Sequence, residues 1–175
     1  KLSFVFYYVS GGTRINWLAM GPTESTMRVS WSQTAQKDEL LKAFKEWYEV
    51  PTRFIEATKQ PFVTALYDRD PLDTWVKGHI AVMGDAAHAM LPYHAQGAGQ
   101  SIEDAWVLAR LLGKNDEGPA AALRRFEALR KDRADRMIQH SRDAERWYHL
   151  DDVDDVGRRN ARFRRYNEKA SFTPQ

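Results

Sequence analysis

Gly78-His79-Ile80-Ala81-Val82-Met83-Gly84-Asp85-Ala86-Ala87-His88 is the stretch that decides the fold of this chain. Residues 79–83 form a short apolar segment that ends at a glycine, which predicts a buried strand. Gly84 lets the backbone turn sharply, and Asp85 follows with a side chain that only accepts hydrogen bonds. A carboxylate at the end of a strand suits a sugar or polyol hydroxyl, which can donate a hydrogen bond to it.

A second glycine-rich turn follows at Gln96-Gly97-Ala98-Gly99. After it, one face of a helix is traced by Ile102, Ala105, Trp106, Ala109 and Leu112. The helix starts either at Gly97 or at Ser101, with Asp104 completing a capping box in the second case. A start at Gly97 would direct free N–H groups and the positive end of the helix dipole toward a ligand, which favours negative charge. The order strand, turn, helix predicts a ligand site at the carboxyl end of a strand in an α/β sheet.

The composition of the 175 residues is that of a globular protein, with 43% hydrophobic and 29% charged residues. Because 26 basic residues nearly balance 24 acidic ones, for a net charge of +2, we expect neither nucleic acid nor a membrane surface as a partner. No apolar run approaches the roughly 20 residues of a membrane span. The absence of cysteine excludes disulfides and thiolate metal sites, and the acidic stretch 151–155 lacks the glycine and glutamate of a calcium loop. We therefore expect a cytoplasmic protein without a metal.

The N-terminal part of the chain predicts a small sheet and one helix. Residues 4–9 and 14–19 are rich in β-branched and aromatic residues and flank a Ser-Gly-Gly-Thr turn, which predicts a hairpin. Residues 26–31 predict a third strand. Apolar residues recur at helical spacing over residues 37–48, and residues 62–67 are predicted to be extended.

The C-terminal part predicts a long helix from Pro119 to about Leu150, which the acidic stretch 151–155 ends. Residues 158–175 predict a short helix or a frayed tail. Basic and acidic residues alternate along the long helix, which predicts a solvated face with internal ion pairs. The basic residues of this face are Arg124, Arg125, Arg130, Lys131, Arg133 and Arg136.

Four short motifs together resemble one known family. They are Gly84-Asp85-Ala86-Ala87-His88, Pro92, Gln96-Gly97-Ala98 and Glu103-Asp104-Ala105. At this spacing they are similar to the second FAD-binding motif of the flavoprotein aromatic-ring monooxygenases, the group of salicylate hydroxylase and para-hydroxybenzoate hydroxylase. The resemblance covers roughly residues 1–150. The segment around Tyr7 and Trp17 looks like the substrate-domain hairpin of that family, and the segment around Arg130 and Arg133 looks like its C-terminal helix.

The resemblance implies an α/β (α+β) fold, namely the C-terminal part of a para-hydroxybenzoate hydroxylase-like FAD/NAD(P)-binding fold. On this basis residues 1–73 form a partial substrate-binding domain of sheet and helix, residues 74–113 an FAD-binding segment, and residues 114–175 a C-terminal helical region. The Gly-x-Gly-x-x-Gly motif that binds the ADP half of FAD in this family is absent from these residues. We therefore expect the dinucleotide-binding part to lie outside them.

In function, the resemblance implies an FAD-dependent monooxygenase that hydroxylates a small, salicylate-like aromatic substrate with oxygen and with NADH or NADPH. A homodimer is left open. Two alternatives also stay open. One is a flavin oxidoreductase of the same fold, such as an epoxidase or a reductase, and the other is a non-catalytic chain that acts through its long helix.

The resemblance also assigns roles to the motif residues. Asp85, presented by the turn at Gly84, is expected to bind the ribityl chain of FAD. The backbone of Gly97, Ala98 and Gly99 is expected to face the pyrimidine edge of the flavin, where N–H groups favour the negative charge that a reduced flavin carries.

Residues for substrate and catalysis are less well defined. Pro92 is expected to line the space between the flavin ring and the substrate. His94 is a candidate base, since imidazole titrates in the range that suits deprotonation of a phenol, and the alternative is a loop histidine bonded to backbone or water. Tyr7 and Trp17 are candidates for the wall of an aromatic substrate pocket, with packing in the sheet as the alternative.

Overall fold

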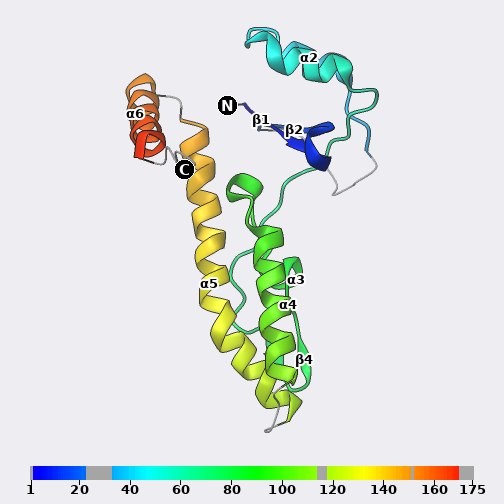
Figure 1. The fold of residues 1–175 in the computed structure, drawn as a ribbon, viewed down its shortest axis with the longest axis vertical. Helices are drawn as coiled ribbons and strands as arrows, with labels where there is room; N and C mark the ends of the chain where they lie inside the picture. The colour runs from blue at the N-terminus through cyan, green and yellow to red at the C-terminus, as the bar shows by residue number, and fades with distance from the viewer. Residues whose placement is uncertain (1, 23–32, 114–117, 151, 170–175) are drawn as a thin grey trace. The chain divides into compact units, whose positions relative to one another are not determined.

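The computed structural model describes residues 2–22, 33–113, 118–150 and 152–169. The chain divides into two compact units, Lys1–Leu66 and Tyr67–Gln175. Each unit is built from its own strands and helices, coloured in chain order in Figure 1. The third strand predicted over residues 26–31 lies outside the described residues.

The first unit contains the predicted hairpin. Strands β1 (Ser3–Val9) and β2 (Arg14–Met20) pair antiparallel through the short 3-10 turn η1 (Ser10–Gly12). Alternate residues of β1 point to opposite faces, so that Phe4 and Phe6 share one face and Tyr7 lies on the other. The prediction of a hairpin in this part of the sequence is confirmed.

Two helices follow where the sequence predicted one over residues 37–48. Helix α1 (Lys37–Phe44) is shorter than predicted, and helix α2 (Glu49–Ala57) begins after a turn. Pro51 lies in the first turn of α2, where a missing N–H costs no helical hydrogen bond. The prediction for residues 37–48 is thus wrong at its C-terminal end. Residues 62–67 form no strand, although Phe62 makes an isolated bridge with Thr34.

Aromatic rings form the packing between the hairpin and its two helices. Phe4 stacks on Trp17, with ring centroids 5.4 Å apart, and on Phe54 at 6.1 Å. Phe44 meets Phe4 edge to face at 5.6 Å. Offset and edge-on pairs of this kind contribute beyond the apolar area that they bury, so they fix one face of the hairpin against α1 and α2.

The second unit begins with a very short hairpin. Strands β3 (Val76–Lys77) and β4 (Ile80–Ala81) pair antiparallel over two residues each. A buried strand over residues 79–83 is therefore not observed, and the Ile80 side chain is 72% exposed. The reason is that, in the part of the chain that the structure describes, β4 has a neighbouring strand on one side only.

Helices make up the rest of the second unit. After the single turn α3 (Asp85–His88) and the 3-10 turn η2 (Pro92–His94), α4 (Gly97–Gly113) and α5 (Pro119–Tyr148) run side by side (Figure 1). Trp75, Ala87, Phe126 and Ala134 form the buried core between the loops and these helices. The long helix predicted from Pro119 is confirmed and ends at Tyr148.

The last helix, α6 (Val153–Lys169), is longer than the short helix or frayed tail predicted for residues 158–175. It begins inside the acidic stretch, because the Asp152 carboxylate accepts a hydrogen bond from the Asp155 N–H at 2.9 Å and so caps the helix. Arg159 donates to the carbonyl of Trp147 at 3.0 Å, near the end of α5. The acidic stretch therefore separates two helices.

Candidate functional site

The turn at Gly84 has a backbone that only glycine adopts without strain. Its φ of 60° and ψ of −145° lie in a region that side-chain-bearing residues avoid. A Cβ at this position would also lie 3.1 Å from the Ser101 Oγ, which places the turn directly against the beginning of α4. Asp85 follows as the first residue of α3. Its carboxylate is exposed and accepts no hydrogen bond from any described residue, so it is available to a donor from outside the chain.

Helix α4 starts at Gly97, as the ligand-binding alternative requires. The first helical hydrogen bond runs from the Gln100 N–H to the Gln96 carbonyl at 2.8 Å. The N–H groups of Gly97, Ala98 and Gly99 precede this bond and have no acceptor in the described ranges. They form a donor group at the positive end of the helix dipole.

The capping box predicted at Ser101 and Asp104 is wrong. Ser101 lies inside the helix, and its hydroxyl donates to the Gly97 carbonyl at 3.1 Å. The Asp104 carboxylate turns away from the helix backbone, because it is engaged by the Gly84 N–H at 3.0 Å and by two buried side chains.

Asp104 is the centre of a buried polar network between the turn and the two long helices. His88 and Asp104 are both fully buried, and the His88 Nε2 lies 2.6 Å from the Asp104 Oδ2. The Arg130 Nε donates to the other carboxylate oxygen, Oδ1, at 2.7 Å. The Asp104 carboxylate thus joins α3, α4 and α5 at one point.

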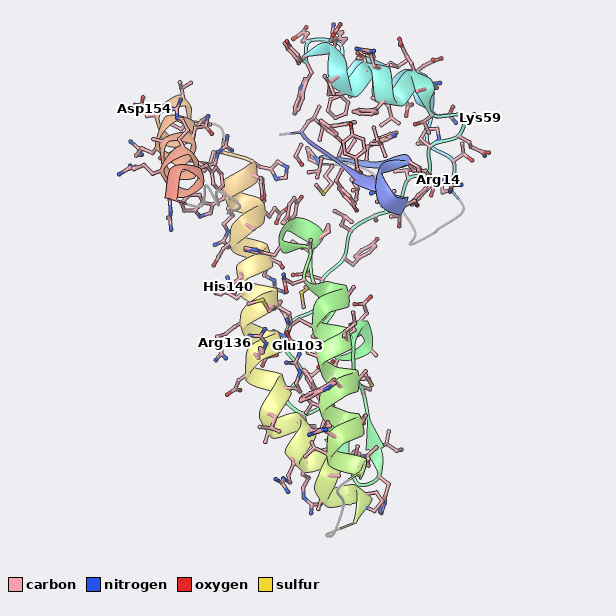
Figure 2. The ribbon with its side chains drawn as sticks, in the orientation of Figure 1. Arg14, Lys59, Glu103, Arg136, His140 and Asp154 are labelled. Atoms are coloured by element: carbon pink, nitrogen blue, oxygen red, sulfur yellow. The ribbon has the colours of Figure 1, made fainter. Side chains whose placement is uncertain are left out.

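The network continues along Arg130 toward the surface. One terminal nitrogen of Arg130 donates to the Gln100 carbonyl at 3.2 Å and to its side-chain oxygen at 2.9 Å, and the other pairs with Glu103. Arg133 then holds Glu103 through two hydrogen bonds, at 2.7 and 2.8 Å. In Figure 2 Glu103 lies between α4 and α5, whereas Arg136 points outward from α5.

The sequence prediction of a solvated basic face on the long helix is therefore wrong for Arg130, which is buried. Arg133 is exposed as predicted, but its ion pair is with Glu103 of α4 and not within the helix. Among the six basic residues named for this face, all of which the structure describes, Lys131 makes the expected pair within the helix, with Asp135 at 2.7 Å. Farther along the helix Arg146 pairs with Asp143 at 3.4 Å. A signal for Arg130 was present in the sequence, because it falls at four-residue spacing between the apolar residues Phe126, Ala134 and Ile138. By contrast, no pattern in the sequence predicted that His88 and Arg130 would bind Asp104.

The loop before α4 carries the predicted residues Pro92 and His94, both exposed on η2. The His94 ring lies 6.2 Å from the His140 ring, and no hydrogen bond to another described residue holds it. Tyr93, between them, stacks on Tyr148 at 6.0 Å. Burial first, and the nearby Glu145 carboxylate second, raise the pKa of the Tyr93 phenol. The phenol of Tyr93 therefore stays neutral near neutral pH.

The first unit contains the two predicted pocket residues on opposite faces of its hairpin. Trp17 lies on the face that packs against the helices, and its indole N–H donates to the Thr58 hydroxyl at 2.9 Å. Tyr7 lies on the other face, 49% exposed, and its hydroxyl accepts a hydrogen bond from Asn16 at 2.9 Å. Trp17 therefore packs within the first unit, which was the alternative to a pocket wall, whereas Tyr7 is accessible to solvent.

The carboxylates of the network have low pKa values. Burial by itself would raise the pKa of Asp104, but the hydrogen bonds from His88, Arg130 and the Gly84 N–H outweigh burial and lower it. The hydrogen bond from Arg133 is the largest cause that lowers the pKa of Glu103, to about 2. Both groups are therefore ionised near neutral pH, and Arg130 has a charged partner on each side.

The low pKa of Glu103 predicts a pH-dependent stability. Because the pKa is lower in the folded chain than its ordinary 4.5, the contribution is complete above about 4.5 and is lost as the pH falls toward about 2. Glu103→Gln is expected to lower the free energy of unfolding at neutral pH by about 1 kcal/mol, a modest value because the pair is partly exposed. Urea unfolding across this pH range should show that the difference from the wild type shrinks as the pH falls.

Glu145→Gln is the matched control, because Glu145 is exposed on α5 and makes no ion pair with a described residue. Its stability should follow that of the wild type at every pH. A Glu103→Gln effect that is the same near pH 2 as at neutral pH would contradict the assignment.

The described residues offer no site of two other kinds. They contain no group of three or more His, Asp or Glu side chains that could hold a metal ion. No helix among them combines the length and the apolar character needed to cross a membrane.

Comparison with known proteins identifies related sequences. The family model described as FAD binding domain matches residues 9–141. The 3-amino-4-hydroxybenzoate 2-monooxygenase PtmB3 of Streptomyces platensis is 44% identical over 122 residues, which cover 70% of this chain and 31% of that protein. The salicylate hydroxylase of Pseudomonas putida is 41% identical over 125 residues, which cover 70% of this chain and 29% of the relative.

A solved structure is similar in fold. A salicylate hydroxylase substrate complex matches 98% of this chain and 45% of its own chain, with a TM-score of 0.73 and 30% identity. The mixed helix and sheet architecture is therefore that of an FAD-dependent hydroxylase. The chain spans about a third of the length of the curated relatives it matches.

Proposed function

The chain belongs to the FAD binding domain family, and we propose that it forms the ribityl and ring end of the FAD site in a monooxygenase that hydroxylates a small aromatic substrate with oxygen and NADH or NADPH. The observation that carries this proposal is the pairing of a free carboxylate, Asp85, with a free helix N-terminus at Gly97. The contact of Gly84 with Ser101 makes these two features neighbours.

The donor set fits the flavin end of FAD. Ribityl hydroxyls donate hydrogen bonds, and the exposed Asp85 carboxylate can accept them. The three free N–H groups of Gly97, Ala98 and Gly99 can donate to the oxygen and nitrogen atoms of the pyrimidine edge, and the helix dipole favours negative charge there. FAD, when bound, would supply the reactivity toward oxygen that amino-acid side chains lack.

The remaining site residues follow from their exposure. Pro92 and His94 are exposed on the loop that leads into Gly97, so we propose Pro92 at the ring face and His94 as the candidate base for a phenolic substrate. Tyr7 is the better candidate for a substrate contact, because Trp17 is engaged with Thr58. We propose a cytoplasmic location, which fits the absence of cysteine from the sequence.

The test uses the complete gene product that contains this chain. We expect a yellow protein with bound flavin, in which salicylate or 3-amino-4-hydroxybenzoate, the compounds named for two relatives, accelerates oxidation of NADH or NADPH. A colourless protein without flavin would overturn the proposal. Accelerated oxidation without a hydroxylated product would point to a reductase, and light scattering would show whether the protein is a dimer.

The role of Asp85 has its own prediction. Asp85→Ala should raise the dissociation constant for FAD at least about tenfold, because hydrogen bonds to a charged acceptor contribute about 1.5–3 kcal/mol each. Titration of the apoprotein with FAD, followed by flavin fluorescence, measures the change. Asp132→Ala, which removes an exposed carboxylate from α5, is the control and should bind FAD as the wild type does. Equal affinity of both variants would refute the ribityl role.

A further inference from the structure

We propose that His88, Asp104 and Arg130 form a positioning unit that holds Asp85 at a fixed place beside the N-terminus of α4, and that this unit thereby sets the affinity and the reduction potential of the flavin. The proposal rests on the proposed function, because it concerns the same site. None of the three side chains is exposed to a ligand, since His88 and Asp104 are fully buried and Arg130 is 3% exposed. They act through the residues that they hold.

The Asp104 carboxylate holds both ends of the segment that presents Asp85. The Gly84 N–H immediately before Asp85 donates to it at 3.0 Å, and His88, three residues after Asp85, approaches it at 2.6 Å. The segment between these contacts is the single turn α3, and so short a helix is not stable by itself. The direction of the Asp85 side chain therefore depends on the two contacts with Asp104.

The same network also holds the beginning of α4. Asp104 is itself a residue of α4, and Arg130 reaches back from α5 to the carbonyl and the side chain of Gln100. Gln100 directly follows the three free N–H groups. The two parts of the proposed flavin site, the carboxylate and the helix N-terminus, are thus tied to one buried carboxylate. Because both parts bind one rigid ligand, a change in their spacing weakens at least one of the contacts.

The chemistry of His88 favours a hydrogen-bond donor over a catalytic base. Its Nδ1 is buried and has no partner in the described part of the chain, and its ring lies 5.3 Å from the ring of Trp75. A neutral imidazole with its proton on Nε2 satisfies Asp104 and leaves no buried N–H without an acceptor. Arg130 and Arg133 together already balance the charges of Asp104 and Glu103. His88 therefore anchors the turn and does not exchange protons with a substrate.

The test compares two variants of His88 in the complete flavoprotein. His88→Leu removes the hydrogen bond to Asp104, whereas His88→Gln offers an amide N–H at a similar distance along the side chain. We expect His88→Leu to raise the dissociation constant for FAD about tenfold, because Asp85 is then no longer held in place. It should also lower the midpoint potential of the bound flavin, because a cofactor that Asp85 does not fix would make weaker contacts with the N–H groups of α4. His88→Gln should recover most of both properties.

Ile138→Ala is the control for a loss of stability alone. Ile138 is buried on α5 and has no hydrogen bond to the network, so its truncation should lower the melting temperature without changing FAD affinity or potential. The proposal is overturned if His88→Leu binds FAD as the wild type does. It is also overturned if Ile138→Ala, at the same loss of melting temperature as His88→Leu, changes FAD affinity and potential by the same amount. A wild-type protein without flavin would instead overturn the proposed function.

Discussion

Replacing Arg130 by methionine is expected to lower the free energy of unfolding by about 3–5 kcal/mol, which is the usual cost of removing one partner from a buried ion pair. Methionine retains most of the apolar length of arginine, so the loss reflects charge and hydrogen bonding more than volume. The Asp104 carboxylate would lose the Nε donor at 2.7 Å, and the buried side-chain oxygen of Gln100 would lose its donor at 2.9 Å. Urea unfolding of the protein, followed by circular dichroism, measures the effect.

Arg136→Met is the matched control on the same helix. Arg136 is exposed on the outer side of α5 (Figure 2), so its replacement should change the unfolding free energy by no more than about 0.5 kcal/mol. If Arg130→Met were as mild as Arg136→Met, the buried network would not stabilise the fold. Loss of the native signal altogether would agree with the prediction, because the expected cost is a large part of the stability of an ordinary domain.

The contrast between Arg130 and Arg136 shows what the sequence could predict about the long helix. Its length was predictable, since apolar residues recur over thirty residues of helix and Pro119 marks its first turn. The partner of each arginine was not predictable, because acidic residues three or four positions away offer ion pairs on the helix surface. The spacing of Arg130 among apolar residues indicated an inward position but named no partner. The packing of α5 against α4 brings Asp104 within hydrogen-bonding distance of Arg130. The ion pairs of Glu103 and Asp104 with the arginines of α5 depend on the same packing.

The local backbone geometry at Gly84 and Gly97 was easier to predict than the strands around it, and the roles proposed for the residues there stay predictions. The turn at Gly84 was predictable, because the conformational freedom of glycine acts locally. The helix start at Gly97 was one of two starts that the sequence allowed, and the structure shows this one. The strand over residues 79–83 was predicted too long, since its length depends on neighbouring strands. The prediction of a capping box at Ser101 was wrong because contacts with residues distant in the sequence also determine where Asp104 points. Asp104 satisfies every local rule for a cap, yet the buried donors around it make stronger contacts.

The second large effect is expected at the turn itself. Gly84→Ala should lower the free energy of unfolding by about 3 kcal/mol, because two costs add. The backbone conformation, with φ 60° and ψ −145°, costs a residue other than glycine about 1–3 kcal/mol. The new Cβ would also lie 3.1 Å from the Ser101 Oγ, whose hydroxyl is held by the Gly97 carbonyl and cannot move away without losing that bond.

Gly118→Ala separates these two costs. Gly118, before α5, has a similar backbone conformation, with φ 87° and ψ 159°, but a Cβ there would meet no atom within 4 Å. It should therefore show the backbone strain alone, and Gly84→Ala should cost more by the contact with Ser101. The same unfolding measurement made with FAD present should show a further loss for Gly84→Ala only, since Asp85 moves with the turn. If Gly84→Ala lowers the free energy of unfolding no more than Gly118→Ala does, the Ser101 side chain moves aside without cost. The turn would then not be packed tightly against α4.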